Sequence, residues 1–127
     1  MTTAYDMAFH SLNVGQAAEA GFIFRAIQHG LSVSRPMFDT EKYDFITDSK
    51  SEMHRVQVKS VLTGTKAIVA HGKNRKDRYS SAQCDFIAIW CVETDEWYII
   101  PTDEVEGRSI NLKEKYHKYR EAWFQLK

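Results

Sequence analysis

The chain has few cysteines and prolines and carries no net charge. Its 17 basic and 17 acidic residues balance at neutral pH, so any binding of nucleic acid has to come from an uneven distribution of charge. The two cysteines, Cys84 and Cys91, are seven positions apart on a segment that looks extended, which points them to opposite faces of a strand and excludes a disulfide between them. Because free thiols imply a reducing compartment, we expect an intracellular, cytoplasmic protein.

Long hydrophobic runs and clustered metal ligands are also missing. No apolar run approaches about 18 residues, the length that a membrane-spanning helix requires, and the first residues lack the basic cluster of a signal peptide. We therefore expect no partnership with a membrane. The five histidines are scattered along the chain, which argues against a metal site built from Cys and His. With 43% apolar and 27% charged residues, the composition predicts one soluble globular domain over residues 1–127.

Two short segments within residues 43–60 alternate apolar and polar side chains with a period of two, which is typical of half-buried strands. Polar residues 49–52 separate these segments, so the simplest arrangement is an antiparallel hairpin. A turn centred on them sets Asp44 opposite Gln57, and cross-strand neighbours have Cβ atoms about 5 Å apart. Lys59 lies two residues beyond Gln57 and shares its face. The hairpin therefore predicts an acid, an amide and an amine side by side.

This combination of side chains suits the handling of a phosphodiester through a divalent cation. A carboxylate and a carbonyl oxygen are hard ligands appropriate to Mg²⁺, which keeps several of its waters. Lys59 is placed to hold a phosphate oxygen or to favour hydroxide formation at a metal-bound water. Any solvent-facing hairpin can carry the same three residue types, so the spacing by itself favours an ordinary surface strand.

Asp44 followed 13 residues later by Gln57-Val58-Lys59 resembles the PD-(D/E)XK nuclease superfamily in its Q-x-K form, in particular the small intron-encoded homing endonucleases and the archaeal Holliday-junction resolvases. The expected order of elements, a helix, about three strands, a helix and a further strand, extends this resemblance over most of residues 10–105. Tyr43 stands where the motif has proline, and Gln57 replaces an acid. The resemblance implies an α/β, restriction-endonuclease-like core with a mixed, mostly antiparallel sheet flanked by helices.

The resemblance also implies a function and its residues. The expected activity is Mg²⁺-dependent hydrolysis of DNA phosphodiesters, with Mn²⁺ as a substitute, by a homodimer or homotetramer. Asp44, Gln57 and Val58 would be the metal ligands, and Lys59 would stabilise charge on the nucleophile or the phosphorane. Glu19, in G-Q-A-A-E, matches the acid on the family's first helix; its alternative is a carboxylate that reaches solvent beside apolar neighbours.

Two alternatives follow from the same residues. Gln57 in place of an acid favours a catalytically silent module that binds nucleic acid or assembles with other subunits on the same fold. Phosphate chemistry alone does not choose the sugar, so an RNA-directed nuclease is a third hypothesis.

A basic run at residues 71–79 is the expected nucleic-acid-binding segment. Such a run is usually a solvated loop. Here a glycine near its start and Tyr79 at its end favour an arm that follows a phosphate backbone. Its four cations are Lys73, Arg75, Lys76 and Arg78.

The rest of the chain predicts the elements around this hairpin. A helix capped at Asn13 should end near His29, with Gly30 just beyond it. Residues 85–92 are almost continuously apolar, as in a strand covered on both faces, and Asp85 is interpreted as its boundary. Apolar residues spaced by three and four over residues 112–126 predict a final amphipathic helix.

Overall fold

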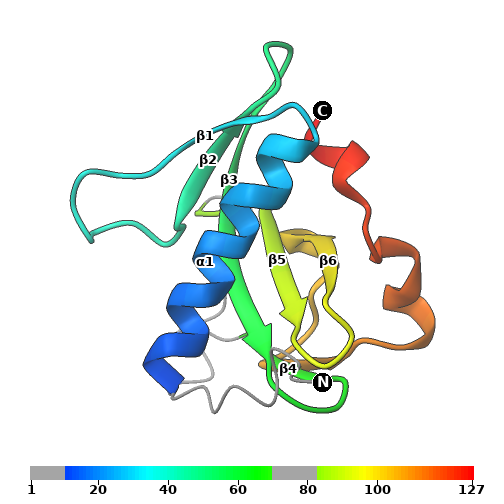
Figure 1. The fold of residues 1–127 in the computed structure, drawn as a ribbon. Coiled ribbons are helices and arrows are strands. Elements are labelled where there is room, and N and C mark those ends of the chain that lie inside the picture. Colours follow the sequence, from blue (N-terminus) through cyan, green and yellow to red (C-terminus); the bar gives the residue numbers. More distant parts are fainter. Residues whose placement is uncertain (1–10, 70–82) are drawn as a thin grey trace.

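A five-stranded mixed sheet organises the protein, whose computed structural model describes residues 11–69 and 83–127 (Figure 1). The strand order is β1-β2-β3-β5-β6. All neighbours are antiparallel except β3 and β5, which run parallel. The mixed, mostly antiparallel sheet predicted from the sequence is therefore confirmed. Its strands are β1 (Ser32–Ser34), β2 (Phe45–Asp48), β3 (Met53–Val61), β5 (Phe86–Cys91) and β6 (Glu96–Pro101).

The remaining elements surround this sheet. The helix α1 (Ser11–Gln28) lies across one face of it (Figure 1). A second, two-stranded sheet pairs β4 (Lys66–Ile68) with β7 (Ser109–Asn111). Three short 3₁₀ helices complete the described chain: η2 (Thr102–Glu104), η3 (Glu114–Tyr119) and η4 (Trp123–Leu126). Within the described ranges, no helix has the length and apolar character needed to cross a membrane.

The end of α1 agrees with the sequence, whereas its start does not. Gly30 adopts a φ of +81°, and the Leu31 N–H donates to the Ala26 carbonyl oxygen at 3.0 Å. This is the glycine-terminated turn that closes many helices. A cap at Asn13 is wrong, because Ser11 and Leu12 are already helical.

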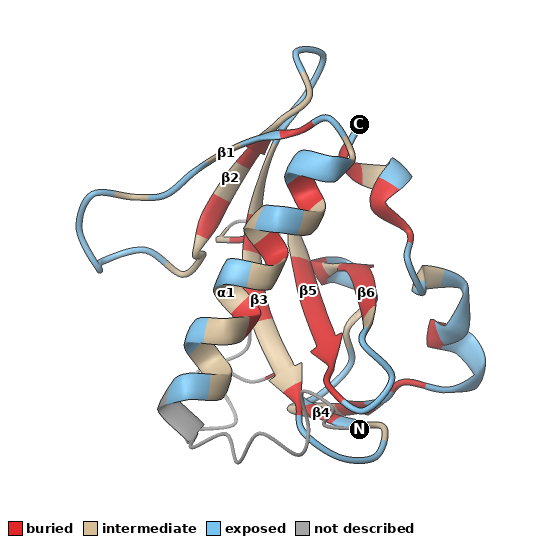
Figure 2. Ribbon diagram, in the orientation of Figure 1, coloured by how far each residue is buried: buried red, intermediate tan, exposed pale blue. Residues whose placement is uncertain are grey.

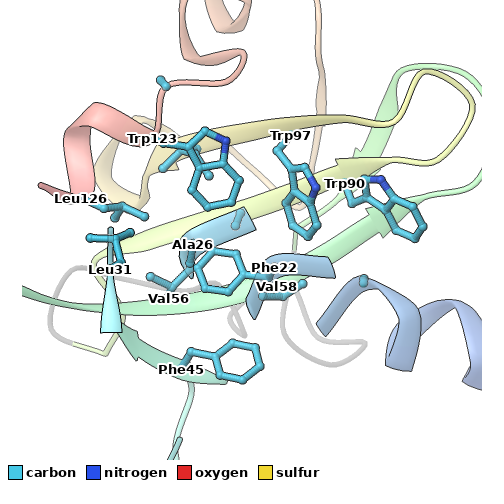
Figure 3. Close-up of a cluster of buried hydrophobic side chains, with 14 of the residues drawn as sticks. Phe22, Ala26, Leu31, Phe45, Val56, Val58, Trp90, Trp97, Trp123 and Leu126 are labelled. Carbon is cyan, nitrogen blue, oxygen red and sulfur yellow. The ribbon is translucent and has the colours of Figure 1, made fainter. Parts of the chain in front are cut away.

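Apolar side chains fill both faces of the main sheet. On the α1 face, Phe22 is fully buried and stacks on Phe45, with ring centroids 5.4 Å apart. The same ring contacts Trp97 and Trp123 at centroid distances of 5.9 and 5.5 Å (Figure 3). The β5 strand is buried almost throughout, as its apolar sequence predicts (Figure 2). On the opposite face lie Val61, Ile87, Ile89, Ile100, Ile110 and Leu112.

The predicted C-terminal helix is wrong. Leu112 and Tyr116 belong to the core on the far face of the sheet, while Trp123 and Leu126 belong to the core under α1. One straight helix cannot reach both faces, so the chain breaks into η3 and η4. At the break, Glu121 adopts a φ of +53°, and its backbone N–H donates to the Trp97 carbonyl oxygen of β6 at 2.6 Å instead of to a carbonyl of η3.

Glu121 holds this break through its carboxylate. Its Oε2 accepts the Trp97 backbone N–H at 2.7 Å, and its Oε1 accepts the Trp123 indole N–H at 2.9 Å. Both donors belong to buried residues, and a buried donor without an acceptor is costly.

Glu121→Ala is expected to lower the free energy of unfolding by about 1 to 2 kcal/mol, because both donors lose their acceptor. Urea denaturation measures the change. Glu114→Ala is the matched control, since Glu114 is exposed and has nearly the same left-handed backbone, with a φ of 52°. Equal losses in the two variants would attribute the effect to backbone conformation and not to the carboxylate.

Candidate active site

The candidate site lies where β2 and β3 separate. The paired residues Phe45–Val56 and Ile46–Arg55 place Asp44 opposite Gln57, which is the register that the sequence predicts. At this point the Val58 N–H donates to the Asp44 carboxylate Oδ2 at 2.8 Å. A side chain thus occupies the position of a β2 carbonyl, and the Asp44 carboxylate lies between the two strands.

Lys59 and Gln57 share the sheet face that points away from α1. Val56 and Val58 are buried in the core under α1, so the intervening Gln57 and the following Lys59 project to the other side. Both are half-buried. Lys59 lies close enough to Asp44 for each charge to act on the pKa of the other group.

Burial shifts the pKa values of both groups towards their neutral forms. The pKa of Asp44 is raised, chiefly by burial and further by the Glu19 charge, although the Val58 N–H, Lys59 and Arg35 oppose this change. The pKa of Lys59 is lowered by burial, while the Asp44 charge opposes the shift. A partly desolvated carboxylate of this kind gains from a nearby cation, because the cation offsets the solvation that it has lost.

Glu19 approaches the site from α1. An ion pair joins its Oε1 to the Arg35 guanidinium at 3.2 Å, and this guanidinium lies 4.9 Å from the centroid of the Phe45 ring. Glu19 and Arg35 line a cleft of about 300 Å³ that also contains Asp44 and the loop between β1 and β2. The structure therefore brings Glu19 and Asp44 to one cleft.

The sequence and the fold are similar to those of known endonucleases. A family model described as PD-(D/E)XK endonuclease matches residues 9–125. The chain belongs to the PD-(D/E)XK endonuclease family. It is similar to a solved structure entitled "The structure of a bacterial homing endonuclease: I-Ssp6803I", with 27% sequence identity, a TM-score of 0.76, and coverage of 91% of this chain and 93% of that one. No curated protein sequence matches the chain. The resemblance read from the motif is confirmed, and the protein is a nuclease by family.

Nucleases of the PD-(D/E)XK family generally use divalent metal ions. The donor atoms where β2 and β3 separate fit such an ion. Asp44 offers a carboxylate. Val58 has an apolar side chain, so only its carbonyl oxygen can ligate; a residue's C=O and N–H point to the same side of a strand, which directs this oxygen towards Asp44. In the described part of the chain, no group of three or more His, Cys, Asp or Glu side chains could hold a metal. One carboxylate with neutral oxygens suits Mg²⁺, which retains several waters.

Gln57 needs a rearrangement before it can join these donors. Its amide Nε2 faces the Val58 carbonyl oxygen at 3.5 Å, and an amide N–H cannot bind a cation. Rotation of the amide by half a turn brings Oε1 to the position that Nε2 now occupies. The contact is long for a hydrogen bond, so this rotation gives up little.

Two arginines of the endonuclease were not predicted. Arg35 orients Glu19, as described above. Arg55 donates three hydrogen bonds to the Asp85 carboxylate, from its backbone N–H at 2.7 Å, its Nε at 3.1 Å and its Nη2 at 2.9 Å. Although burial opposes the shift, the pKa of Asp85 is lowered by these bonds. Asp85 thus fixes the start of β5 to β3, in agreement with its interpretation as a boundary residue.

The predicted basic segment lies outside the described residues. Lys73, Arg75, Lys76 and Arg78 fall between the two described ranges, and their role stays a prediction.

Proposed function

We propose that this endonuclease hydrolyses DNA phosphodiesters with Mg²⁺, for which Mn²⁺ can substitute. The observation that carries the proposal is the Asp44 carboxylate held between β2 and β3 by the Val58 N–H at 2.8 Å, with Lys59 on the adjoining face. Asp44, the Val58 carbonyl oxygen and the rotated Gln57 amide would hold the metal ion. When bound, the ion supplies Lewis-acid stabilisation of phosphate oxygens and an activated water.

The side chains of the protein have separate tasks in this proposal. Lys59 would place a cation next to the phosphate oxygens on which negative charge develops as the phosphorus is attacked, and half-burial strengthens that interaction. Glu19, held by Arg35, lines the cleft that contains Asp44, whereas Lys59 projects from the sheet face that points away from α1. Its charge raises the pKa of Asp44, so it increases the benefit of a bound cation and is placed to orient a water of that cation.

Cleavage of supercoiled plasmid DNA tests the proposed function. Nicked or linear product is expected with Mg²⁺ or Mn²⁺ and none with EDTA. If neither DNA nor RNA is cut with either metal, the catalytically silent module replaces this proposal. The specific observation that favours that alternative is the Gln57 amide, whose Nε2 faces the candidate metal site.

The duplex target implies more than one copy of the site. The similar solved structure is that of a homing endonuclease, which supports double-strand cleavage of this type over junction resolution. Because each small subunit carries one site and a duplex has two strands, a homodimer or homotetramer is proposed. Sedimentation velocity distinguishes these states from a monomer.

Neutralising Lys73, Arg75 and Lys76 together is expected to weaken DNA binding and to flatten its salt dependence. Each lost phosphate contact reduces the log-log salt slope by about one unit. Fluorescence anisotropy with a labelled duplex at several salt concentrations measures the slope. Lys113, Lys115 and Lys118, all exposed in the C-terminal segment, provide a control with the same change in net charge. An unchanged slope in the first variant would show that the segment is solvated surface.

A further inference from the structure

The loop between β1 and β2 carries two adjacent, highly exposed apolar side chains. Met37 is 87% exposed and Phe38 71% exposed, directly after Pro36. The loop projects from the body of the protein beside β2 (Figure 1), and its outer part around Met37 and Phe38 is exposed (Figure 2). Singly exposed apolar residues are ordinary on a protein surface, whereas an adjacent pair at the rim of a site calls for a partner.

The position of this pair identifies the partner. Met37 and Phe38 line the same cleft as Glu19 and Asp44, so a duplex whose phosphate reaches Asp44 also meets the loop. The occupant of this surface is therefore the substrate of the proposed function.

The charges of the loop indicate how it contacts that substrate. The two basic residues of the loop, Arg35 and Lys42, are outnumbered by its three acidic residues, Asp39, Glu41 and Asp44, and Arg35 is already paired with Glu19. A loop with more acidic than basic residues gains little from a phosphate backbone, whereas exposed Met and Phe side chains gain from contact with the faces of bases. The contact should therefore be apolar and independent of salt.

We propose that Met37 and Phe38 form a wedge that inserts between neighbouring base pairs and partly unstacks duplex DNA next to the phosphate held at Asp44. Apolar side chains, methionine and phenylalanine among them, kink duplexes in this way in architectural proteins. Unstacking lengthens the backbone and kinks the duplex at that step, so the wedge would change the position of the scissile phosphate relative to Asp44 without touching it. This inference rests on the proposed function.

The double variant Met37→Ala/Phe38→Ala tests the wedge, with Phe124→Ala as its matched control. Phe124 is also 71% exposed, but it lies in η4, in the C-terminal segment that Figure 1 shows on the other side of α1 from the loop. Closed circular plasmid is relaxed by a metal-independent topoisomerase in the presence of each protein, with Ca²⁺ in place of Mg²⁺, and nicking is monitored on the same gel. Anisotropy with a random-sequence 40-base-pair duplex gives the affinity.

Wild type and Phe124→Ala are expected to unwind the plasmid and shift its topoisomers, while the double variant does not. The double variant should bind the duplex about tenfold more weakly, with an unchanged salt slope. Equal unwinding and affinity in all three proteins would overturn the wedge alone, provided that wild type cuts DNA with Mg²⁺. A double variant whose sedimentation coefficient falls would also overturn it, because the pair would then be a contact between subunits. A wild type that neither binds nor cuts DNA would refute the proposed function as well.

Discussion

Lys59→Ala is expected to bind duplex DNA within a few-fold of wild type and to lose cleavage by a factor of 10² or more. Lys59 acts on charge that appears mainly as the phosphorus is attacked, so its removal falls on the chemical step. The strand should survive, because Lys59 projects away from the Val56 and Val58 core face. Single-turnover cleavage and anisotropy separate the two effects.

Two further variants sharpen the test of Lys59. Lys66→Ala removes an exposed lysine from β4 and controls for the loss of one positive charge. Lys59→Arg keeps the charge but replaces a compact ammonium by a planar fork, so only partial activity is expected. If purified Lys59→Ala cuts at the wild-type single-turnover rate, Lys59 is not catalytic.

Asp44→Asn is expected to abolish cleavage and, without metal, to raise the free energy of unfolding at neutral pH. The folded state holds the pKa of Asp44 above its unfolded value, so the folded protein binds this proton more tightly than the unfolded chain. The stability contributed by this group therefore rises as pH falls through the raised pKa, and the charged carboxylate costs stability above it. Asparagine removes that cost and keeps an oxygen that can accept the Val58 N–H.

Thermal unfolding with and without metal checks this prediction independently of activity. Mg²⁺ at a hundred times its dissociation constant would stabilise wild type by about 2.7 kcal/mol, and Asp44→Asn should lose that gain. In wild type the stabilisation by Mg²⁺ should shrink on acidification, because protons compete with the metal for the Asp44 carboxylate, whose pKa is raised. Asp103→Asn, on the exposed surface of η2, is the control. An equal Mg²⁺ gain in wild type and Asp44→Asn would remove Asp44 from the metal site.

Local sequence patterns predicted the β2–β3 hairpin and the end of α1, because both are determined by residues close together in the chain. Alternation with a period of two fixed the β2–β3 register, because a slip by one residue would have turned Phe45 and Val56 towards solvent. Gly30 marked the end of α1 because only a residue that tolerates a positive φ closes that turn easily. The parallel pairing of β3 and β5 was not predicted, since the family resemblance implied only that the sheet would be mixed and mostly antiparallel.

The residues that the sequence did not reveal act through distant partners. Arg35 matters because α1 brings Glu19 to it, and Arg55 matters because β5 brings Asp85 to it. Neither arginine has a local feature in the sequence that predicts its partner. The prediction of a final helix was wrong for a related reason. The apolar residues of this segment are divided between the two faces of the sheet, so tertiary packing overrode the helical spacing.

The hydrogen bond between Asp44 and Val58 joins residues 14 positions apart in the sequence. The hydrogen bond between Arg55 and Asp85, which joins β3 to the start of β5, links residues 30 positions apart. Shorter loops close with less loss of chain entropy, so the hairpin with the proposed metal ligands can assemble before β5 docks against it. Openings that release β5 and β6 would leave Asp44, Gln57 and Val58 together but expose them to water. Folding of this nuclease would then have two stages, an early one that collects the ligands and a later one that shifts the pKa values of Asp44 and Lys59.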